Sequence, residues 1–123
     1  MIESWDENEG TTTYVWGYHD NLLLAMVKNA TATQVQAALT YTNEALQEIT
    51  DPIELRSIFQ SLRTSLSQAM VTSYTYDLFG KPTSVTDPSG KKRSFGYDAS
   101  LRLRTTRDDN GKILNKYEYH YKQ

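Results

Sequence analysis

The sequence predicts an α+β fold: an antiparallel β-meander sheet of five to seven strands, with a two-helix hairpin inserted between strands and packed on one face. Aromatic and β-branched residues recur at the period of a strand in residues 11–18 and again in residues 70–123, and residues 22–28 form an apolar run of strand length. Between these segments the apolar residues follow the period of a helix. The chain has 123 residues, the length of one domain, so all parts are expected to share one core.

Residues 11–30 predict an N-terminal β-hairpin. Residues 11–18 alternate β-branched and aromatic side chains, and residues 22–28 form an apolar run of strand length. The three residues between them suit a tight turn. Residues 1–10 are acidic and contain neither the basic nor the apolar region of a signal peptide, so no signal peptide is expected in this segment.

Residues 31–69 predict a helical hairpin. Either Thr31 or Thr33 can cap the first helix, whose apolar face consists of Val35, Ala38, Leu39, Ala45, Leu46 and Ile49. Asp51, Pro52 and Glu54 predict the start of the second helix, as N-cap, first helical residue and third residue of a capping box. The apolar face of this helix consists of Leu55, Ile58, Phe59, Leu62 and Leu66. Because few residues separate the two helices, we expect an antiparallel pair that covers one face of the sheet.

Residues 70–123 carry an internal repeat, marked by two aromatic residues one position apart. The marker recurs at intervals of 21 and 22 residues, as Tyr74 and Tyr76, Phe95 and Tyr97, and Tyr117 and Tyr119. A second marker, an aspartate three residues before a glycine, recurs 21 residues apart as Asp87 with Gly90 and Asp108 with Gly111. Alternation along a strand puts both rings on one face, and aspartate and glycine favour turns. The repeat predicts a meander with strands near residues 71–76, 83–86, 92–97, 102–107 and 113–121.

Residues 74–90 resemble the YD repeat of RHS proteins, whose Y-x-Y-D-x-x-G-R-L core is followed about ten residues later by D-x-x-G. The resemblance extends to residue 123, with Leu101 at the glycine position of the second unit and His120 at the aspartate position of the third. Residues 14–18 and 25–31 are similar to a variant of the family in which such residues precede a helical insertion. The residues that match the repeat motif are Tyr74, Tyr76, Asp77, Gly80, Asp87, Gly90, Phe95, Tyr97, Asp98, Gly111, Tyr117 and Tyr119.

The resemblance implies a non-enzymatic structural and interaction module, a C-terminal piece of a large bacterial RHS-like protein that is secreted, wall-associated or at the cell surface. In the family, many such units spiral into a β-shell that can enclose a toxin domain. The expected partners are neighbouring YD repeats of a larger parent chain, and exposed sheet edges are expected to allow self-association. The alternative is a carbohydrate-binding module that uses aromatic rings on the sheet face, with Tyr14, Trp16 and Tyr18 as candidate ligand-binding residues.

The sequence offers few groups for catalysis or metal binding. It has no cysteine and two histidines, His19 and His120, which are expected to approach each other only if the first and last strands pair. Standard nucleotide-binding and hydrolase motifs are absent from the sequence. Asp77 and Asp98 stand at strand ends, where an aspartate typically caps the backbone. We therefore predict no catalytic residue, no metal site and no cofactor.

Charge is divided unevenly along the chain. Residues 1–72 contain nine acidic and three basic residues, whereas residues 73–123 contain six acidic and ten basic ones. A basic strip interleaved with tyrosines is one pattern of nucleic-acid binding, and the basic residues here are Lys91, Lys92, Arg93, Arg102, Arg104 and Arg107. However, Arg102, Arg104 and Lys92 alternate with Leu101, Leu103 and Ser94 or Phe95, as on the solvated face of a strand. With a net charge of −2, no nucleic-acid partner is predicted. The longest apolar run, residues 22–27, is far shorter than a membrane helix, so membrane insertion is not expected.

Overall fold

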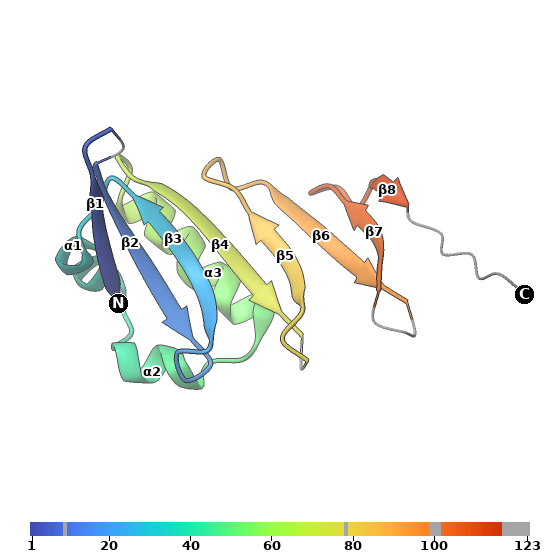
Figure 1. The fold of residues 1–123 in the computed structure, drawn as a ribbon, viewed down its shortest axis with the longest axis horizontal. Coiled ribbons are helices and arrows are strands. Elements are labelled where there is room, and N and C mark those ends of the chain that lie inside the picture. The colour runs from blue at the N-terminus through green and yellow to red at the C-terminus, as the bar shows by residue number, and fades with distance from the viewer. Residues whose placement is uncertain (9, 78, 99–101, 117–123) are drawn as a thin grey trace, which may run out of the picture.

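A computed structural model describes residues 1–8, 10–77, 79–98 and 102–116. They form one eight-stranded antiparallel sheet in which each strand pairs with the next along the chain (Figure 1). The strands are β1 (Ile2–Asp6), β2 (Gly10–Gly17), β3 (Leu22–Lys28), β4 (Met70–Tyr76), β5 (Pro82–Thr86), β6 (Lys92–Tyr97), β7 (Leu103–Arg107) and β8 (Ile113–Lys116). The predicted antiparallel meander is therefore confirmed.

The predicted count of five to seven strands is wrong, because the sequence analysis missed β1. All five residues of β1 are exposed, so the strand has none of the alternation that burial imposes on a sequence. It is held by backbone pairing to β2, from Ile2 opposite Tyr14 to Asp6 opposite Gly10. The other predicted strands are found within two residues of their predicted starts, and the last is described as far as Lys116.

Three helices lie between β3 and β4: α1 (Ala32–Ala38), α2 (Asn43–Glu48) and α3 (Pro52–Ser65). The prediction of two helices is wrong because the first one is broken. Leu39 has an extended backbone, and the Thr42 hydroxyl accepts a hydrogen bond from the Ala45 amide and so caps a new helix. The apolar stripe crosses this break, since Leu46 is as fully buried as Val35.

The helix caps follow the expected residue types with one change of place. Thr31, not Thr33, caps α1, and it forms a capping box with Gln34. Asp51 caps α3 by accepting a hydrogen bond from the Ile53 amide, and Pro52 is the first helical residue. A capping box, which the sequence predicts at α3, is thus present at α1.

All three helices lie behind the first half of the sheet in Figure 1, while β5–β8 extend beyond them. α3 packs against β4, whereas α1 and α2 pack against β2. One cluster of buried side chains joins helices and strands: Val15, Leu24, Ala25, Val27, Ala30, Val35, Leu39, Leu46, Leu55, Ile58, Phe59, Leu62 and Val71. The predicted packing of the helices on one sheet face is therefore correct, but it covers only part of that face.

Candidate functional site

Four consecutive hairpins close in the same way. In each, the residue before an aspartate pairs with the residue five positions after that aspartate: Tyr76 with Pro82, Thr86 with Lys92, Tyr97 with Leu103 and Arg107 with Ile113. The aspartate amide donates to the carbonyl four residues on, at 2.9, 2.9, 2.9 and 2.8 Å for Asp77, Asp87, Asp98 and Asp108. The turn thus recurs at every hairpin from β4 to β8, about every ten residues, twice in each repeat of the sequence.

The aspartate side chain holds each turn together. One carboxylate oxygen of Asp87 accepts the amides of Ser89 and Lys91, both at 3.0 Å. Asp77 and Asp108 accept the corresponding pairs of amides, and Asp98 accepts the amide of Arg102 at 2.9 Å. Three turns place a glycine in the left-handed region that glycine favours, with φ of +77°, +88° and +83° at Gly80, Gly90 and Gly111. Asp77 and Asp98 therefore cap backbone amides, as their positions predict.

Hydrogen bonds to the carboxylate also stabilise its charge. The hydroxyl of Ser89 donates to Asp87 at 2.6 Å. This bond is the main cause that lowers the pKa of Asp87; desolvation opposes it, and the amides of Lys91 and Ser89 lower the pKa further. The turn is consequently built around an ionised aspartate.

Tyrosine hydroxyls bridge neighbouring strands where the backbone ladder has ended. The β3–β4 ladder runs from Ala25–Ser73 to Lys28–Met70, and beyond it the Tyr76 hydroxyl donates to the Leu23 carbonyl at 2.7 Å. The same bridge recurs one repeat later, where the Tyr97 hydroxyl donates to the Pro82 carbonyl beyond the end of the β5–β6 ladder. Each tyrosine directly precedes a turn aspartate. The tyrosine therefore binds the backbone near the start of the preceding strand, and the aspartate stabilises the turn that leads to the next strand.

Packing around the two bridging tyrosines differs. The ring of Tyr76 contacts Tyr18 edge to face, with centroids 6.1 Å apart, whereas the Lys81 Nζ lies 5.5 Å from the centroid of Tyr97. Burial raises the pKa of Tyr76, and its neighbours Tyr74 and Tyr18 raise it further. Burial also raises the pKa of Tyr97. Both hydroxyls therefore keep the proton that they donate.

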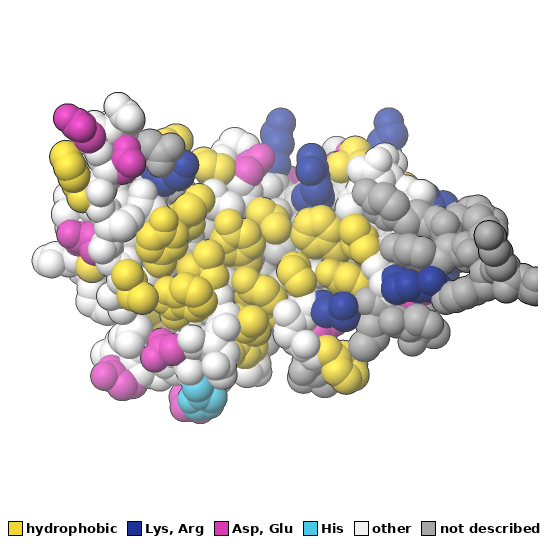
Figure 2. Space-filling model, viewed as in Figure 1, with side chains coloured by type: hydrophobic (Ala, Val, Ile, Leu, Met, Phe, Trp, Pro, Cys, Tyr) yellow, Lys and Arg dark blue, Asp and Glu magenta, His cyan; other side chains and the backbone are white. Residues whose placement is uncertain are grey.

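Aromatic and aliphatic side chains form a band on the sheet face opposite the helices. Val15, Val27 and Val71 point into the core, so the residues that alternate with them point away from it. The cross-strand pairs Tyr14–Met26 and Tyr74–Val85 lie on this outer face. Figure 2 shows the band as a nearly continuous apolar surface. We call it the aromatic face; its half-buried members are Tyr14, Trp16, Met26, Tyr74, Val85 and Phe95.

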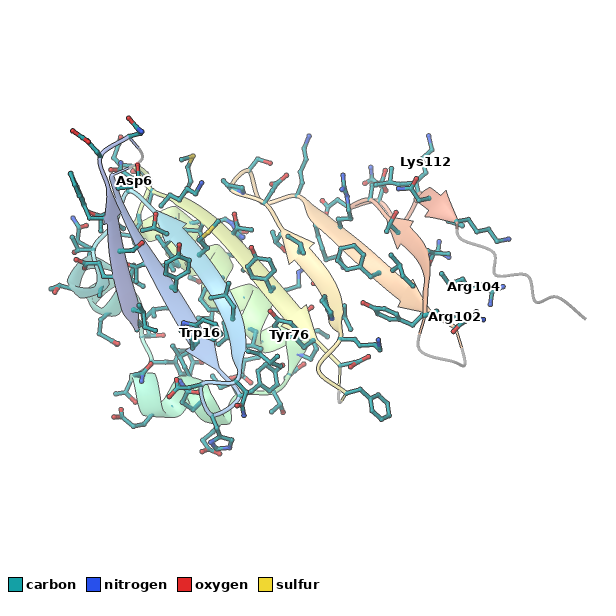
Figure 3. The ribbon with its side chains drawn as sticks, viewed as in Figure 1. Asp6, Trp16, Tyr76, Arg102, Arg104 and Lys112 are labelled. Atoms are coloured by element: carbon teal, nitrogen blue, oxygen red, sulfur yellow. The ribbon has the colours of Figure 1, made fainter. Side chains whose placement is uncertain are left out.

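The three candidate ligand-binding residues of the N-terminal hairpin are not together. Tyr14 and Trp16 lie on the aromatic face, with Trp16 labelled in Figure 3. Tyr18 lies beyond the end of β2, packs against the core, and its hydroxyl donates to the Thr50 carbonyl at 3.4 Å. Tyr18 therefore packs against the core and is not part of the aromatic face.

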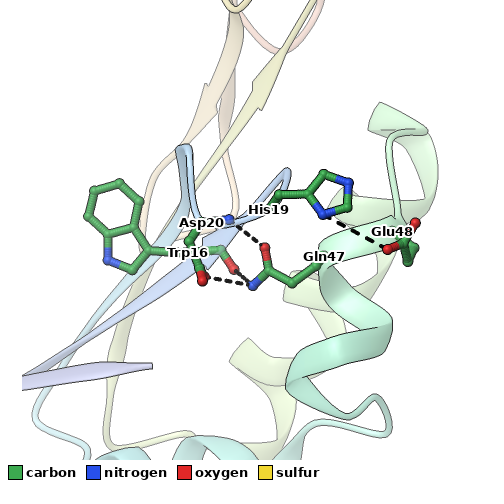
Figure 4. A network of polar contacts seen from close by, with 5 residues as sticks. All are labelled: Trp16, His19, Asp20, Gln47 and Glu48. Carbon is green, nitrogen blue, oxygen red and sulfur yellow. Dashed lines mark hydrogen bonds and ion pairs between the residues drawn. The ribbon is translucent and has the colours of Figure 1, made fainter.

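The turn between β2 and β3 is clamped by α2 (Figure 4). Tyr18, His19 and Asp20 all have left-handed backbones, with φ of 51°, 58° and 62°. Gln47 accepts the Asp20 amide at 2.7 Å and donates to the Trp16 carbonyl and the Asp20 carboxylate at 2.9 and 3.0 Å. These three bonds hold a conformation that residues with a side chain rarely adopt.

The histidines do not form a site in the described part of the chain. The His19 side chain is 72% exposed, and its Nδ1 lies 4.0 Å from Glu48. The condition for the two histidines to approach, pairing of the first and last strands, is not met among the described residues, since β1 and β8 lie at opposite edges of the sheet. His120, Tyr117 and Tyr119 lie outside the described residues. Within residues 1–8, 10–77, 79–98 and 102–116, no group of three histidine, aspartate or glutamate side chains could hold a metal ion.

The basic side chains are divided between surfaces. Arg93 pairs with Val85 on the outer face, whereas Lys92 pairs with Thr86 on the face that carries the helices. Arg102 binds Asp98 through an Nε–Oδ2 contact of 3.1 Å, and Arg104 is exposed on β7 (Figure 3). This distribution fits the solvated-strand interpretation better than a continuous phosphate-binding strip.

Comparison with known families relates the segment that contains the hairpins to a repeat family. Residues 63–92 and 76–113 match the RHS repeat family. These residues, less than half of the chain, are similar to RHS repeats. The matched residues run from the last turn of α3 to the start of β8 and so include all four aspartate turns and both bridging tyrosines, whereas Leu23, the acceptor of the Tyr76 bridge, lies outside them. No curated protein matches the chain.

Two structural features outside or at the margin of the repeat strands were not predicted from the sequence. Arg63 on α3 donates to the Val71 carbonyl, the Ser73 hydroxyl and the Thr86 carbonyl at 3.2, 2.9 and 3.0 Å, which joins the helix to the first two repeat strands. Its position four residues after Phe59, at the margin of the apolar stripe, is the signal that could have revealed it. Asp6 accepts the Asn8 amide at 2.7 Å in the β1–β2 hairpin, a related aspartate turn before the matched segment. No helix among the described residues is long and apolar enough to cross a membrane.

Proposed function

We propose that the chain is a non-enzymatic structural and interaction module of a larger RHS-repeat protein at the cell surface or in secreted form. The single observation that carries this proposal is the identical closure of four successive hairpins. Because every hairpin places its new strand beside the previous one, further repeats extend the sheet by the same rule. A sheet that extends in this way is suited to form the wall of a β-shell. The resemblance to RHS proteins supports the extracellular setting.

The outer strands of the described sheet are suited to receive neighbouring repeats. Edge strands offer backbone donors and acceptors to an incoming strand. β1 exposes Ile2 and Trp5, with 59% and 72% of their surface accessible, and β8 exposes Ile113 and Leu114. In a larger protein we expect adjacent repeats to pair with these edges. In the isolated chain, we expect a second copy of the chain to pair with these edges instead of adjacent repeats.

Sedimentation velocity over a range of concentrations tests this proposal. We expect the weight-average mass to rise with concentration, and Trp5→Lys or Leu114→Lys to reduce the rise by placing a charge on an edge strand. Phe79→Lys is the matched control, because Phe79 is equally exposed but lies in a turn. A chain that stays monomeric at the highest concentration contradicts edge pairing, and so does an equal effect of all three variants.

A carbohydrate-binding module is the second candidate, and the aromatic face is the observation that favours it. Aromatic rings on an open sheet face can stack on sugar rings. Trp16 is half-buried on this face, so part of its ring is open to a ligand. We expect a glycan array to detect binding that Trp16→Leu abolishes and Trp5→Leu leaves intact. An array without a signal, or binding that both variants retain, contradicts this function.

A further inference from the structure

The sheet face that carries the helices contains a groove beside α3. The first two turns of α3 form one side of it, and β4, β5 and β6 form the floor. Its volume is about 870 Å³, within the range of small-molecule sites. The groove exists because the helices stop at the first half of the sheet and leave β5–β8 uncovered on this side.

The walls and the floor of the groove differ in chemistry. Apolar surface predominates on the walls, where Tyr18, Leu22 and Ile53 stand. The floor carries hydroxyls, because β4–β6 place small polar residues on this face: Thr75, Thr83, Ser84 and Ser94. The Thr75 hydroxyl bonds to those of Thr83 and Ser84, which fixes part of the floor.

Two cations and one carboxylate line the groove. Arg56 reaches it from α3, and Lys92 reaches it from β6. Asp77 also lines it, but its Oδ1 already accepts the amides of Phe79 and Lys81 at 2.9 and 3.0 Å in the repeat turn. The charge that remains for a ligand is therefore positive.

Arg56 is incompletely satisfied. Its Nε is buried and has no hydrogen-bond partner among the described residues. By contrast, Arg63, two turns further along the same helix, donates three hydrogen bonds to acceptors of the protein itself. Buried donors in native proteins are almost always paired, so the guanidinium of Arg56 is the group of the groove that a bound acceptor would complete.

We propose that this groove binds a carboxylate carried on an apolar or aromatic body. The carboxylate would accept hydrogen bonds from Arg56, whose planar guanidinium matches a carboxylate, and from Lys92. The body would lie against Tyr18, Leu22 and Ile53. A singly charged head fits better than a phosphate, because the described residues that line the groove include two cations together with Asp77. A free small acid and a glutamate flanked by apolar residues in a peptide segment share this chemistry.

Titration of the full chain with phenylacetate, followed by two-dimensional amide NMR, tests the proposal. We expect saturable shifts at Ile53, Arg56 and Ser94, and weaker binding of benzyl alcohol and acetate, which lack the charge and the ring, respectively. Arg56→Met should weaken phenylacetate binding about tenfold, as expected for the loss of a charged hydrogen bond. Lys92→Met should weaken it as well, and serves if the helix variant folds poorly. Arg104→Met, at an exposed site outside the groove, should have no effect.

The source of the carboxylate is separated by a second ligand, the capped peptide Phe-Glu-Phe. If the peptide competes with phenylacetate and binds more tightly, the occupant is a chain segment, whereas tighter phenylacetate binding indicates a free acid. Absence of saturable shifts for both, or binding that Arg56→Met and Lys92→Met leave unchanged, overturns the proposal. Edge pairing is measured by a different property, the mass in solution, so failure of one proposal leaves the other intact.

Discussion

Removal of one oxygen atom from Tyr76 isolates the contribution of the tyrosine bridge. Tyr76→Phe keeps the ring against Tyr18 and deletes the hydroxyl that donates to the Leu23 carbonyl at 2.7 Å. Beyond the β3–β4 ladder this bond connects the core strands to the first repeat strand. A partly buried hydrogen bond of this kind contributes about 1 kcal/mol to the free energy of unfolding. For a chain of 123 residues, that corresponds to about 4 °C in Tm.

Urea unfolding followed by tyrosine and tryptophan fluorescence measures the loss. Tyr74→Phe is the matched control, because it removes the same atom two residues earlier, from a hydroxyl with no hydrogen bond among the described residues. We expect Tyr76→Phe to lower the unfolding midpoint by about 0.5 M, given a slope of about 2 kcal/mol per molar urea, and Tyr74→Phe to change it little. Equal losses for the two variants would refute the role assigned to the bridge.

The same bridge predicts an alkaline pH dependence. Burial raises the pKa of Tyr76 above its ordinary value of 10.0, so the folded state favours the protonated hydroxyl. The stabilisation is therefore complete below pH 10 and is lost as the pH rises through the pKa of the folded state. We expect the stability difference between the wild type and Tyr76→Phe to shrink over that range. A difference that stays constant would contradict a donating hydroxyl.

Three further predictions concern the turns and the helix. His19→Gly should raise the free energy of unfolding by about 1 kcal/mol, because it relieves a left-handed residue; a loss of stability in urea unfolding would contradict this. The folded-state pKa of Asp87 is lowered, so its ionised carboxylate contributes to the free energy of unfolding. This contribution is present above about pH 4 and is lost as the pH falls through the folded-state pKa. Asp87→Asn should therefore flatten the acid decline of the urea midpoint, and unchanged slopes would argue against the turn. Arg63→Met should cost about 2 kcal/mol in thermal unfolding, because three hydrogen bonds join α3 to β4 and β5, whereas Arg104→Met should cost nearly nothing. Similar losses for both arginines would contradict that joint.

The repeat strands could be predicted from the sequence because their signals are local. Asp87 and Gly90 act on their own backbone within five residues, so the turn is encoded where it forms. The apolar stripe of α3 likewise reports its own burial, with Leu55 and Phe59 fully enclosed. Period and turn chemistry therefore suffice for the order and direction of these elements.

The remaining features depend on contacts between distant segments. β1 has no buried residue, so only its pairing with β2 reveals it. The bridge from Tyr76 to Leu23 joins residues 53 positions apart, and it exists because two strands part at one end. The groove at Arg56 results from where the helices end on the sheet. None of these relations leaves a periodic trace in the sequence.

The central claim is that this sheet is a building unit whose outer strands accept further strands. Amide hydrogen exchange of the full chain at low and high protein concentration tests it most directly. We expect amides of β1 or β8 to gain protection as the protein concentration rises, while amides of β3 and β4, inside the sheet, keep the protection they have. If β1 and β8 exchange at the same rate at every concentration, the edges do not pair, and the proposed role as a sheet-extending module is contradicted.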